Sequence, residues 1–245
     1  MSTSRLRLCL LSLALSVGGC AAIEGEPWEL SRKGSYGWIN RAGIYEDYGV
    51  DTRIRFDTNN GPVDEKFHTD LIGRFGFVTG AEYFVADDVS IIGGIDYRKF
   101  DSEDTDGFDY DTIETLGGFV GMRWILPYYW VEQGRLRPFV QGSFGYWPTT
   151  RFDFDFDLDA PGVEDPELHF RGDEYVFFAA STGLLYQINR NLVFELSALY
   201  EWPLIATRDK DVELDLGLPS VPVIPIDTEL EPEGLIVLFG LIWYF

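Results

Sequence analysis

Apolar and polar residues alternate with a period of two along most of the chain, which predicts β-strands rather than helices. Seven segments show this alternation before the C-terminus, at residues 48–57, 68–85, 89–100, 112–126, 136–152, 175–187 and 192–206. An eighth, residues 235–245, places Leu235, Val237, Phe239, Leu241, Trp243 and Phe245 on one face. Eight is an even number, as closure of an up-and-down bacterial membrane barrel requires.

The connections between these segments alternate in length. Short connections occupy residues 86–88, 129–135 and 189–191, whereas long ones occupy residues 57–66, 101–111, 153–174 and 208–233. Transmembrane barrels place short turns on the periplasmic side and long loops outside the cell. This order predicts that both termini are periplasmic.

The N-terminus has the features of an export signal, which we assign to residues 1–22. Arg5 and Arg7 precede a short apolar run that is too short to cross a bilayer as a helix. Cys20 follows two glycines, an arrangement that resembles a lipoprotein signal in which the cysteine is acylated. Ordinary cleavage after Ala21 or Ala22 is the alternative. Residues 23–47 are then a periplasmic extension or the start of the first strand, and residues 48–245 form the barrel.

The acidity of the chain is confined to the four long connections. The net charge is −22, and these connections hold 26 acidic and 4 basic residues, so the rest of the chain is neutral. The predicted barrel therefore carries its negative charge in the external loops. Loops of this charge argue against binding to nucleic acid.

Charged residues also lie on the faces of the strands opposite the apolar residues. An eight-stranded barrel has just enough interior to be filled by side chains, and buried charges must be paired. We therefore expect a charge network that plugs the lumen. Its predicted members are Arg53, Arg55, Arg74, Glu82, Asp96, Arg98, Arg123, Glu195 and Glu201.

The last strand carries the clearest signature. Gly240, Trp243 and Phe245 resemble the C-terminal signal that the assembly machinery of outer-membrane barrels reads, although Leu238 stands where that pattern usually has a polar residue. With the strand count and alternation, residues 48–245 resemble the small eight-stranded outer-membrane barrels: the OmpA transmembrane domain, OmpX and OmpW.

The resemblance implies an all-β fold, an eight-stranded antiparallel up-and-down transmembrane β-barrel in the outer membrane. The implied partners are outer-membrane lipid, lipopolysaccharide and the barrel-assembly machinery, and the barrel is expected to be a monomer. The leading functional interpretation is a non-enzymatic envelope or surface-interaction protein with a plugged lumen. The alternative is a narrow channel for small or apolar solutes, similar to OmpW.

One acidic loop is a candidate cation site. Carboxylates crowd around a turn-forming glycine, and hard cations such as calcium and magnesium take several oxygen ligands. Loose association of divalent ions and plain solubility are the alternatives, and no other cofactor is predicted. The candidate ligands are Asp101, Glu103, Asp104, Asp106, Asp109 and Asp111.

A third interpretation is a lipid A-modifying enzyme. PagL, a lipid A deacylase of similar size, uses a histidine and a serine with a nearby acid. Here His68 is the candidate base, but Ser90 lies too far along the neighbouring strand to assume contact. We therefore assign no catalytic residue.

Overall fold

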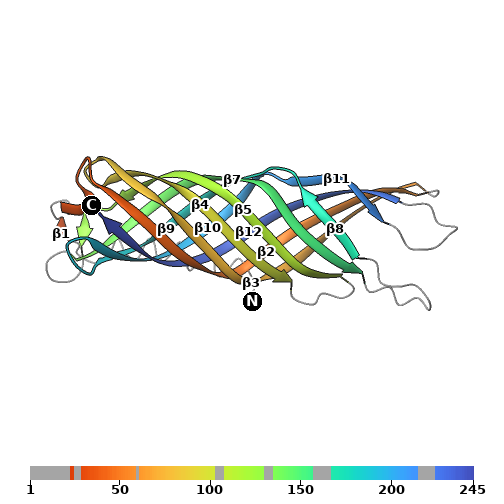
Figure 1. Ribbon diagram of the computed structural model, residues 1–245, viewed down its shortest axis with the longest axis horizontal. Helices are drawn as coiled ribbons and strands as arrows, with labels where there is room; N and C mark the ends of the chain where they lie inside the picture. The colour runs from red at the N-terminus through yellow and green to blue at the C-terminus, as the bar shows by residue number, and fades with distance from the viewer. Residues whose placement is uncertain are drawn as a thin grey trace.

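Eight antiparallel strands form a closed barrel (Figure 1). The computed structural model describes residues 23–24, 29–58, 61–102, 108–129, 135–156, 167–214 and 224–245. Around the ring the strands are β2 (Tyr36–Thr58), β3 (Gly61–Ala86), β4 (Val89–Ser102), β5 (Phe108–Ile125), β7 (Leu136–Phe156), β9 (Tyr175–Gln187), β10 (Leu192–Ile205) and β12 (Ile224–Tyr244).

Pairing of β12 with both β10 and β2 closes the ring, which confirms the predicted fold class. In the described part of the chain, no helix has the length and apolar character needed to cross a membrane.

Several strands continue far beyond the segments that alternation predicted. β2 begins at Tyr36, and β2 and β3 continue through most of the predicted connection at 57–66. Two further strands, β8 (Glu167–Gly172) and β11 (Thr207–Leu214), pair with the ends of β7 and β12. These parts of β2, β3, β7 and β12, together with β8 and β11, project from the end of the barrel opposite the C-terminus (Figure 1), and we call them the extension. Much of what was predicted as loop is therefore a raised β-structure.

A β-bulge in β2 reverses which side chains face inward. Leu235 lies opposite Glu46 and Gly234 lies opposite Tyr48, so Asp47 is an extra residue in the ladder. One extra residue turns every later side chain to the other face of the sheet. Beyond the bulge, the buried positions are therefore Val50 and Thr52, each about 1% exposed.

The prediction that Arg53 and Arg55 belong to the lumen network is wrong for this reason. Their side chains are 44% and 33% exposed and lie on the outer face of the extension. A period-two pattern cannot reveal a bulge that changes the face halfway along a strand.

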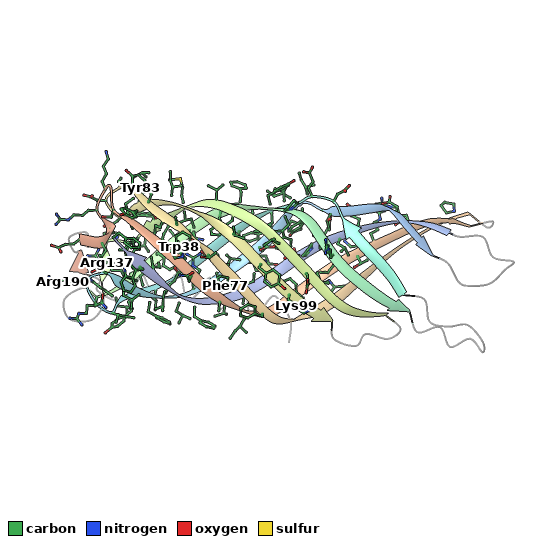
Figure 2. All side chains as sticks on the ribbon, in the orientation of Figure 1. Trp38, Phe77, Tyr83, Lys99, Arg137 and Arg190 are labelled. Atoms are coloured by element: carbon green, nitrogen blue, oxygen red, sulfur yellow. The ribbon has the colours of Figure 1, made fainter. Side chains whose placement is uncertain are left out.

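Large apolar side chains cover the outside of the barrel. Strand β10 exposes apolar residues from Phe194 to Leu204, a length of roughly 33 Å at about 3.3 Å per residue. A strand tilt of about 40° reduces this to an apolar belt roughly 25 Å tall, which matches the apolar band of a transmembrane barrel. Trp38, Phe77 and Tyr83 project outward from this belt in Figure 2. The belt is therefore the lipid-facing surface.

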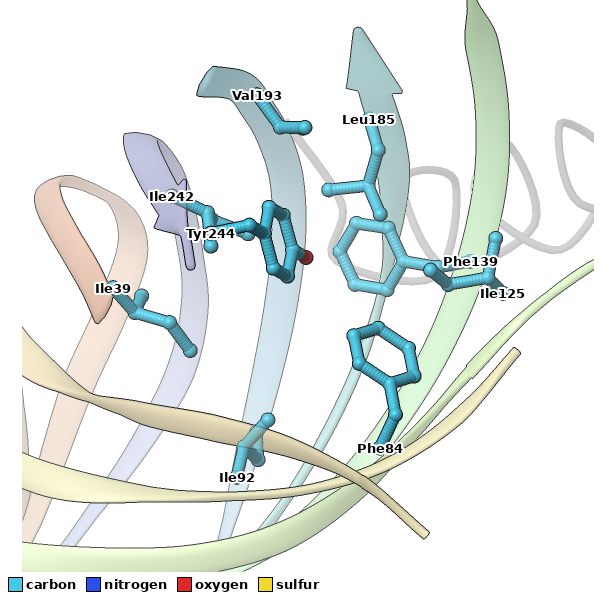
Figure 3. Close-up of a cluster of buried hydrophobic side chains, with 9 residues drawn as sticks. All are labelled: Ile39, Phe84, Ile92, Ile125, Phe139, Leu185, Val193, Ile242 and Tyr244. Atoms are coloured by element: carbon cyan, nitrogen blue, oxygen red, sulfur yellow. The ribbon is translucent and has the colours of Figure 1, made fainter. Parts of the chain in front are cut away.

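An apolar cluster fills the interior at the end that holds the C-terminus. Its side chains converge from strands all around the ring, as Figure 3 shows. Leu30, in the short 3₁₀ helix Glu29–Ser31, packs against the cluster. The cluster consists of Ile39, Phe84, Ile92, Ile125, Phe139, Leu185, Val193, Ile242 and Tyr244.

The segment before β2 is tied to this end by hydrogen bonds. The Ser31 hydroxyl donates to a carboxylate oxygen of Asp88 at 2.5 Å, and the Asp88 amide donates to the Ser31 carbonyl at 2.9 Å. Farther back, β1 (Ile23–Glu24) pairs with β6 (Tyr128–Tyr129). The predicted export signal and Cys20 lie outside the described residues.

Candidate functional site inside the barrel

Five polar side chains from five different strands meet inside the barrel and form what we name the inner charge cluster. Its members are Arg41, Glu82, Arg123, Gln141 and Glu195, all of them buried. Glu195 lies between two arginines, with its carboxylate oxygens 3.0 Å from Arg41 Nε and 2.9 Å from Arg123 Nη2. Arg123 Nη1 is also 3.4 Å from Glu82 Oε2.

The inner charge cluster crosses the lumen and joins the apolar cluster below it. Arg41 on β2 and Gln141 on β7 are four strands apart in the ring of eight, yet Arg41 Nη2 donates to Gln141 Oε1 at 3.5 Å. The Tyr244 hydroxyl donates to Glu82 Oε2 at 2.8 Å. Ser90 Oγ donates to the same carboxylate at 2.6 Å. This arrangement satisfies groups that would otherwise be costly to bury.

Gly240 has a packing role in this cluster. It faces inward on β12 and lies in register between Glu195 on β10 and Arg41 on β2. A Cβ atom there would collide with the carbonyl oxygen of Asn40 and approach Arg41 Cγ to 2.8 Å. The glycine therefore leaves the space through which Arg41 and Glu195 meet. Whether Gly240, Trp243 and Phe245 also act as an assembly signal stays a prediction.

A second group, the outer charge cluster, consists of Asp96, Arg98 and Glu201. Arg98 Nη1 on β4 donates to Glu201 Oε2 at 2.8 Å on β10, four strands away around the ring. Arg98 Nε donates to Asp96 Oδ2 at 2.9 Å. Its guanidinium also lies 4.7 Å from the centre of the Trp147 ring, a cation–π distance. This cluster is a second bridge across the lumen.

A cavity lies between the two clusters. Arg41 and Gln141 of the inner cluster and Asp96 and Arg98 of the outer cluster all reach it. The remaining wall is mostly apolar, and its larger side chains are Val78, Phe119, Phe177, Leu199, Ile236 and Leu238.

Six of the nine residues predicted for the lumen network lie inside the barrel. They are Glu82, Asp96, Arg98, Arg123, Glu195 and Glu201. The side chain of Arg74 is outside the described part of the structure. Arg41 and Gln141 were missed because residues 23–47 had no assigned strand and because Gln141 carries no charge. The inward parity of Gln141 on β7 was a signal that could have identified it.

On the outer face of the extension, ion pairs link β2, β3 and β12. Arg53 Nη2 is 2.5 Å from Asp64 Oδ2, and Lys66 Nζ is 2.9 Å from Asp51 Oδ2. Hydrogen bonds from Arg53 hold the pKa of Asp64 below its usual value. Partial burial opposes ionisation of Asp51, but its bonds with Lys66 and His68 outweigh this and lower its pKa.

The candidate cation loop falls largely outside the described residues. Glu103, Asp104 and Asp106 lie there, and Asp101, Asp109 and Asp111 are described only as backbone of β4 and β5. Elsewhere in the described chain, no group of three histidine, cysteine or acidic side chains is placed to hold a metal ion. A calcium or magnesium site in this loop stays a prediction.

The candidate enzyme residues are far apart. His68 is exposed on the extension, with Nδ1 2.6 Å from Asp51 Oδ1. Ser90 is buried near the other end and bonds to Glu82. Sixteen residue-to-residue steps along β3 lead from His68 to Phe84, the residue opposite Ser90, a length of about 50 Å along the strand. These two residues do not form a nucleophile–base pair.

No protein-family model and no curated protein sequence matches the chain. Among solved structures, the outer membrane protein OprG from Pseudomonas aeruginosa is similar at a TM-score of 0.55 and 15% identity, over 91% of this chain and 99% of OprG. The chain has the fold of a small eight-stranded outer-membrane β-barrel. With its exposed apolar belt, it is an integral membrane barrel of the outer membrane.

Two further solved structures are less similar to the chain. The outer membrane protein AlkL is 16% identical over 91% of this chain and 96% of AlkL, with a TM-score of 0.43. The outer membrane protease OmpT from Escherichia coli is 10% identical over 86% of this chain and 97% of OmpT, with a TM-score of 0.39.

Proposed function

We propose that the protein is a closed, non-conducting envelope barrel that acts through the structure it raises above the membrane. Its lumen is plugged by side chains, and its external acidic segments carry an envelope-structural or surface-interaction role. The observation that carries this proposal is the pair of charge clusters that cross the lumen.

Three successive layers support a closed lumen. The apolar cluster fills the end near the C-terminus, and Leu30 packs against it. The inner and outer charge clusters follow, each with a contact between strands on opposite sides of the ring. An ion crossing the barrel would have to separate buried ion pairs, and breaking a buried pair costs about 3–5 kcal/mol.

The raised extension supports the surface role. Strands β2 and β3 form a long hairpin there, β8 pairs with the end of β7, and β11 pairs with the end of β12. Ion pairs between neighbouring strands lie on its outer face, among them Arg53–Asp64 and Lys66–Asp51. A hydrogen-bonded β-platform presents the attached loops outside the membrane, which supports a role in contact with lipopolysaccharide or with a neighbouring cell-surface molecule.

A narrow passage for small or apolar solutes is the second candidate. The cavity between the charge clusters favours it, because its wall is mostly apolar. Transport would require the inner and outer clusters to open in turn. The two candidates therefore differ in whether the inner and outer charge clusters open at all.

Single-channel recording in planar bilayers distinguishes the two candidates. The wild-type protein is expected to give no stable conductance steps. A variant carrying Glu82→Ala, Arg123→Ala and Glu195→Ala, which removes three of the five side chains of the inner charge cluster, serves as the control for a widened lumen. Stable steps from the wild-type protein, at a rate that scales with the amount of inserted barrel, would contradict the proposal.

A further inference from the structure

The barrel end that carries the short turns has two different basic sectors. In the first, Arg135 precedes β7 and Arg190 lies in the turn between β9 and β10, and both are exposed. The Gln187 amide donates to the Arg135 carbonyl at 2.8 Å, three residues before Arg190, so the two arginines come from neighbouring turns. Arg190 lies at the end of the barrel in Figure 2.

Directly beside these arginines is the edge of the apolar belt. Leu136, which follows Arg135, is in register with Tyr186, and Tyr186 is in register with Phe194. Tyr186 is 39% exposed. Ile188 also faces solvent at 44% exposure. Aromatic side chains at this level mark the membrane–water interface, so Arg135 and Arg190 lie at the depth of the lipid headgroups.

The second basic sector is compensated by acidic residues. Arg32 and Lys33 are exposed in the segment before β2. Glu29 lies three residues before Arg32 in the sequence, and Asp87, in the turn between β3 and β4, lies beside Lys33 in the fold. The Lys33 amide donates to Asp87 Oδ1 at 2.9 Å. By contrast, residues 135–136 and 187–192, which form the first sector, contain no acidic residue. In the described part of this end, Arg135 and Arg190 are therefore exposed basic residues with no acidic residue in their own segments, whereas Glu132, in the connection before Arg135, lies outside the described residues.

We propose that Arg135 and Arg190 bind the phosphate of an anionic phospholipid headgroup in the periplasmic leaflet. Short turns of this kind face the periplasm in outer-membrane barrels. A guanidinium can donate two parallel hydrogen bonds to a phosphate, and basic sites at a membrane surface bind acidic headgroups. Tyr186 and Ile188 contact the lipid next to its headgroup. The lipid ligand would bind firmly enough to accompany the barrel out of the membrane.

The test compares two double variants in vesicles of phosphatidylcholine with phosphatidylglycerol. Arg135→Gln/Arg190→Gln removes the site, and Arg32→Gln/Lys33→Gln removes the same charge from the compensated sector of the same rim. Native mass spectrometry of the extracted barrels measures phosphatidylglycerol retained per protein. The site variant is expected to retain roughly five- to thirty-fold less, on the basis of about fivefold per arginine at a membrane surface.

The control variant is expected to retain phosphatidylglycerol like the wild type. Equal losses in both variants, or no loss in the site variant, would overturn the proposal. Added inorganic phosphate should leave the retained lipid unchanged; displacement at millimolar phosphate would show a free-anion site instead. All variants should unfold at the wild-type temperature in phosphatidylcholine alone, and Arg135→Lys/Arg190→Lys keeps the charge should the glutamine variant fold poorly. None of these outcomes depends on whether the lumen conducts.

Discussion

Replacing Glu195 with alanine should remove the centre of the inner charge cluster. The carboxylate lies about 3 Å from both Arg41 and Arg123. At that separation and an effective dielectric constant of about 20, each attraction is worth about 5 kcal/mol. Desolvation of the ions offsets much of this, so the net loss on removing one partner is about 3–5 kcal/mol. Arg123 would still have Glu82 at 3.4 Å, whereas Arg41 would keep a hydrogen bond to Gln141 Oε1 at 3.5 Å and a more distant attraction to Glu82.

Urea unfolding in lipid vesicles, followed by tryptophan fluorescence, measures this loss as a change in the free energy of unfolding. The matched control is Glu114→Ala, which breaks a pair with Lys99 at 3.1 Å whose side chains are 45% and 34% exposed. An exposed pair of this kind contributes about 1 kcal/mol or less. If Glu195→Ala and Glu114→Ala destabilise the barrel to within about 1 kcal/mol of each other, the reasoning is refuted. Glu195→Gln, which keeps a hydrogen-bond acceptor but no charge, should fall between alanine and wild type.

Two further predictions concern packing and pH. Gly240→Ala should destabilise the barrel by about 1–3 kcal/mol in the same assay because its Cβ would collide with the backbone; Gly142→Ala, whose Cβ would meet nothing closer than 3.7 Å, should be nearly neutral. The lowered pKa of Asp51 means that its pair with Lys66 stabilises the fold above the ordinary pKa of 3.8 and is lost as the pH falls through the lower folded value. The stability difference between wild type and Asp51→Asn should therefore disappear at acid pH, and a constant difference across the titration would contradict this.

The period-two pattern was sufficient to predict the barrel and much of its interior. Glu82, Arg123 and Glu195 lie on the strand faces opposite the apolar residues. When the apolar faces form the outside of a closed barrel, the opposite faces line its interior. Their partners were not predictable, because contacts across the lumen depend on how far each strand is staggered around the ring. Arg123 and Glu195 are on strands three apart, and nothing in either segment indicates that they meet.

The failures have local physical causes. The extra residue Asp47 changed the face of β2, so Arg53 was assigned to the lumen although it pairs with Asp64 outside. The predicted strands were also too short, because charged residues continue the hydrogen-bonded strands beyond the membrane. Outside the bilayer both faces of a strand meet water, so the apolar alternation that marks a strand is lost while its backbone hydrogen bonds continue.

The most direct test of a closed lumen is the reactivity of a cysteine placed between the two charge clusters. Ser143 is 4% exposed and lines the cavity there. The Ser143→Cys substitution changes the size of the side chain very little. In a background where the two native cysteines, Cys9 and Cys20, are replaced by serine, this thiol should stay unlabelled by a hydrophilic maleimide added to both sides of the membrane. Over the same time, an exposed control, Arg32→Cys, should react fully. Labelling of the Ser143→Cys barrel at a rate comparable with the control would contradict the closed lumen.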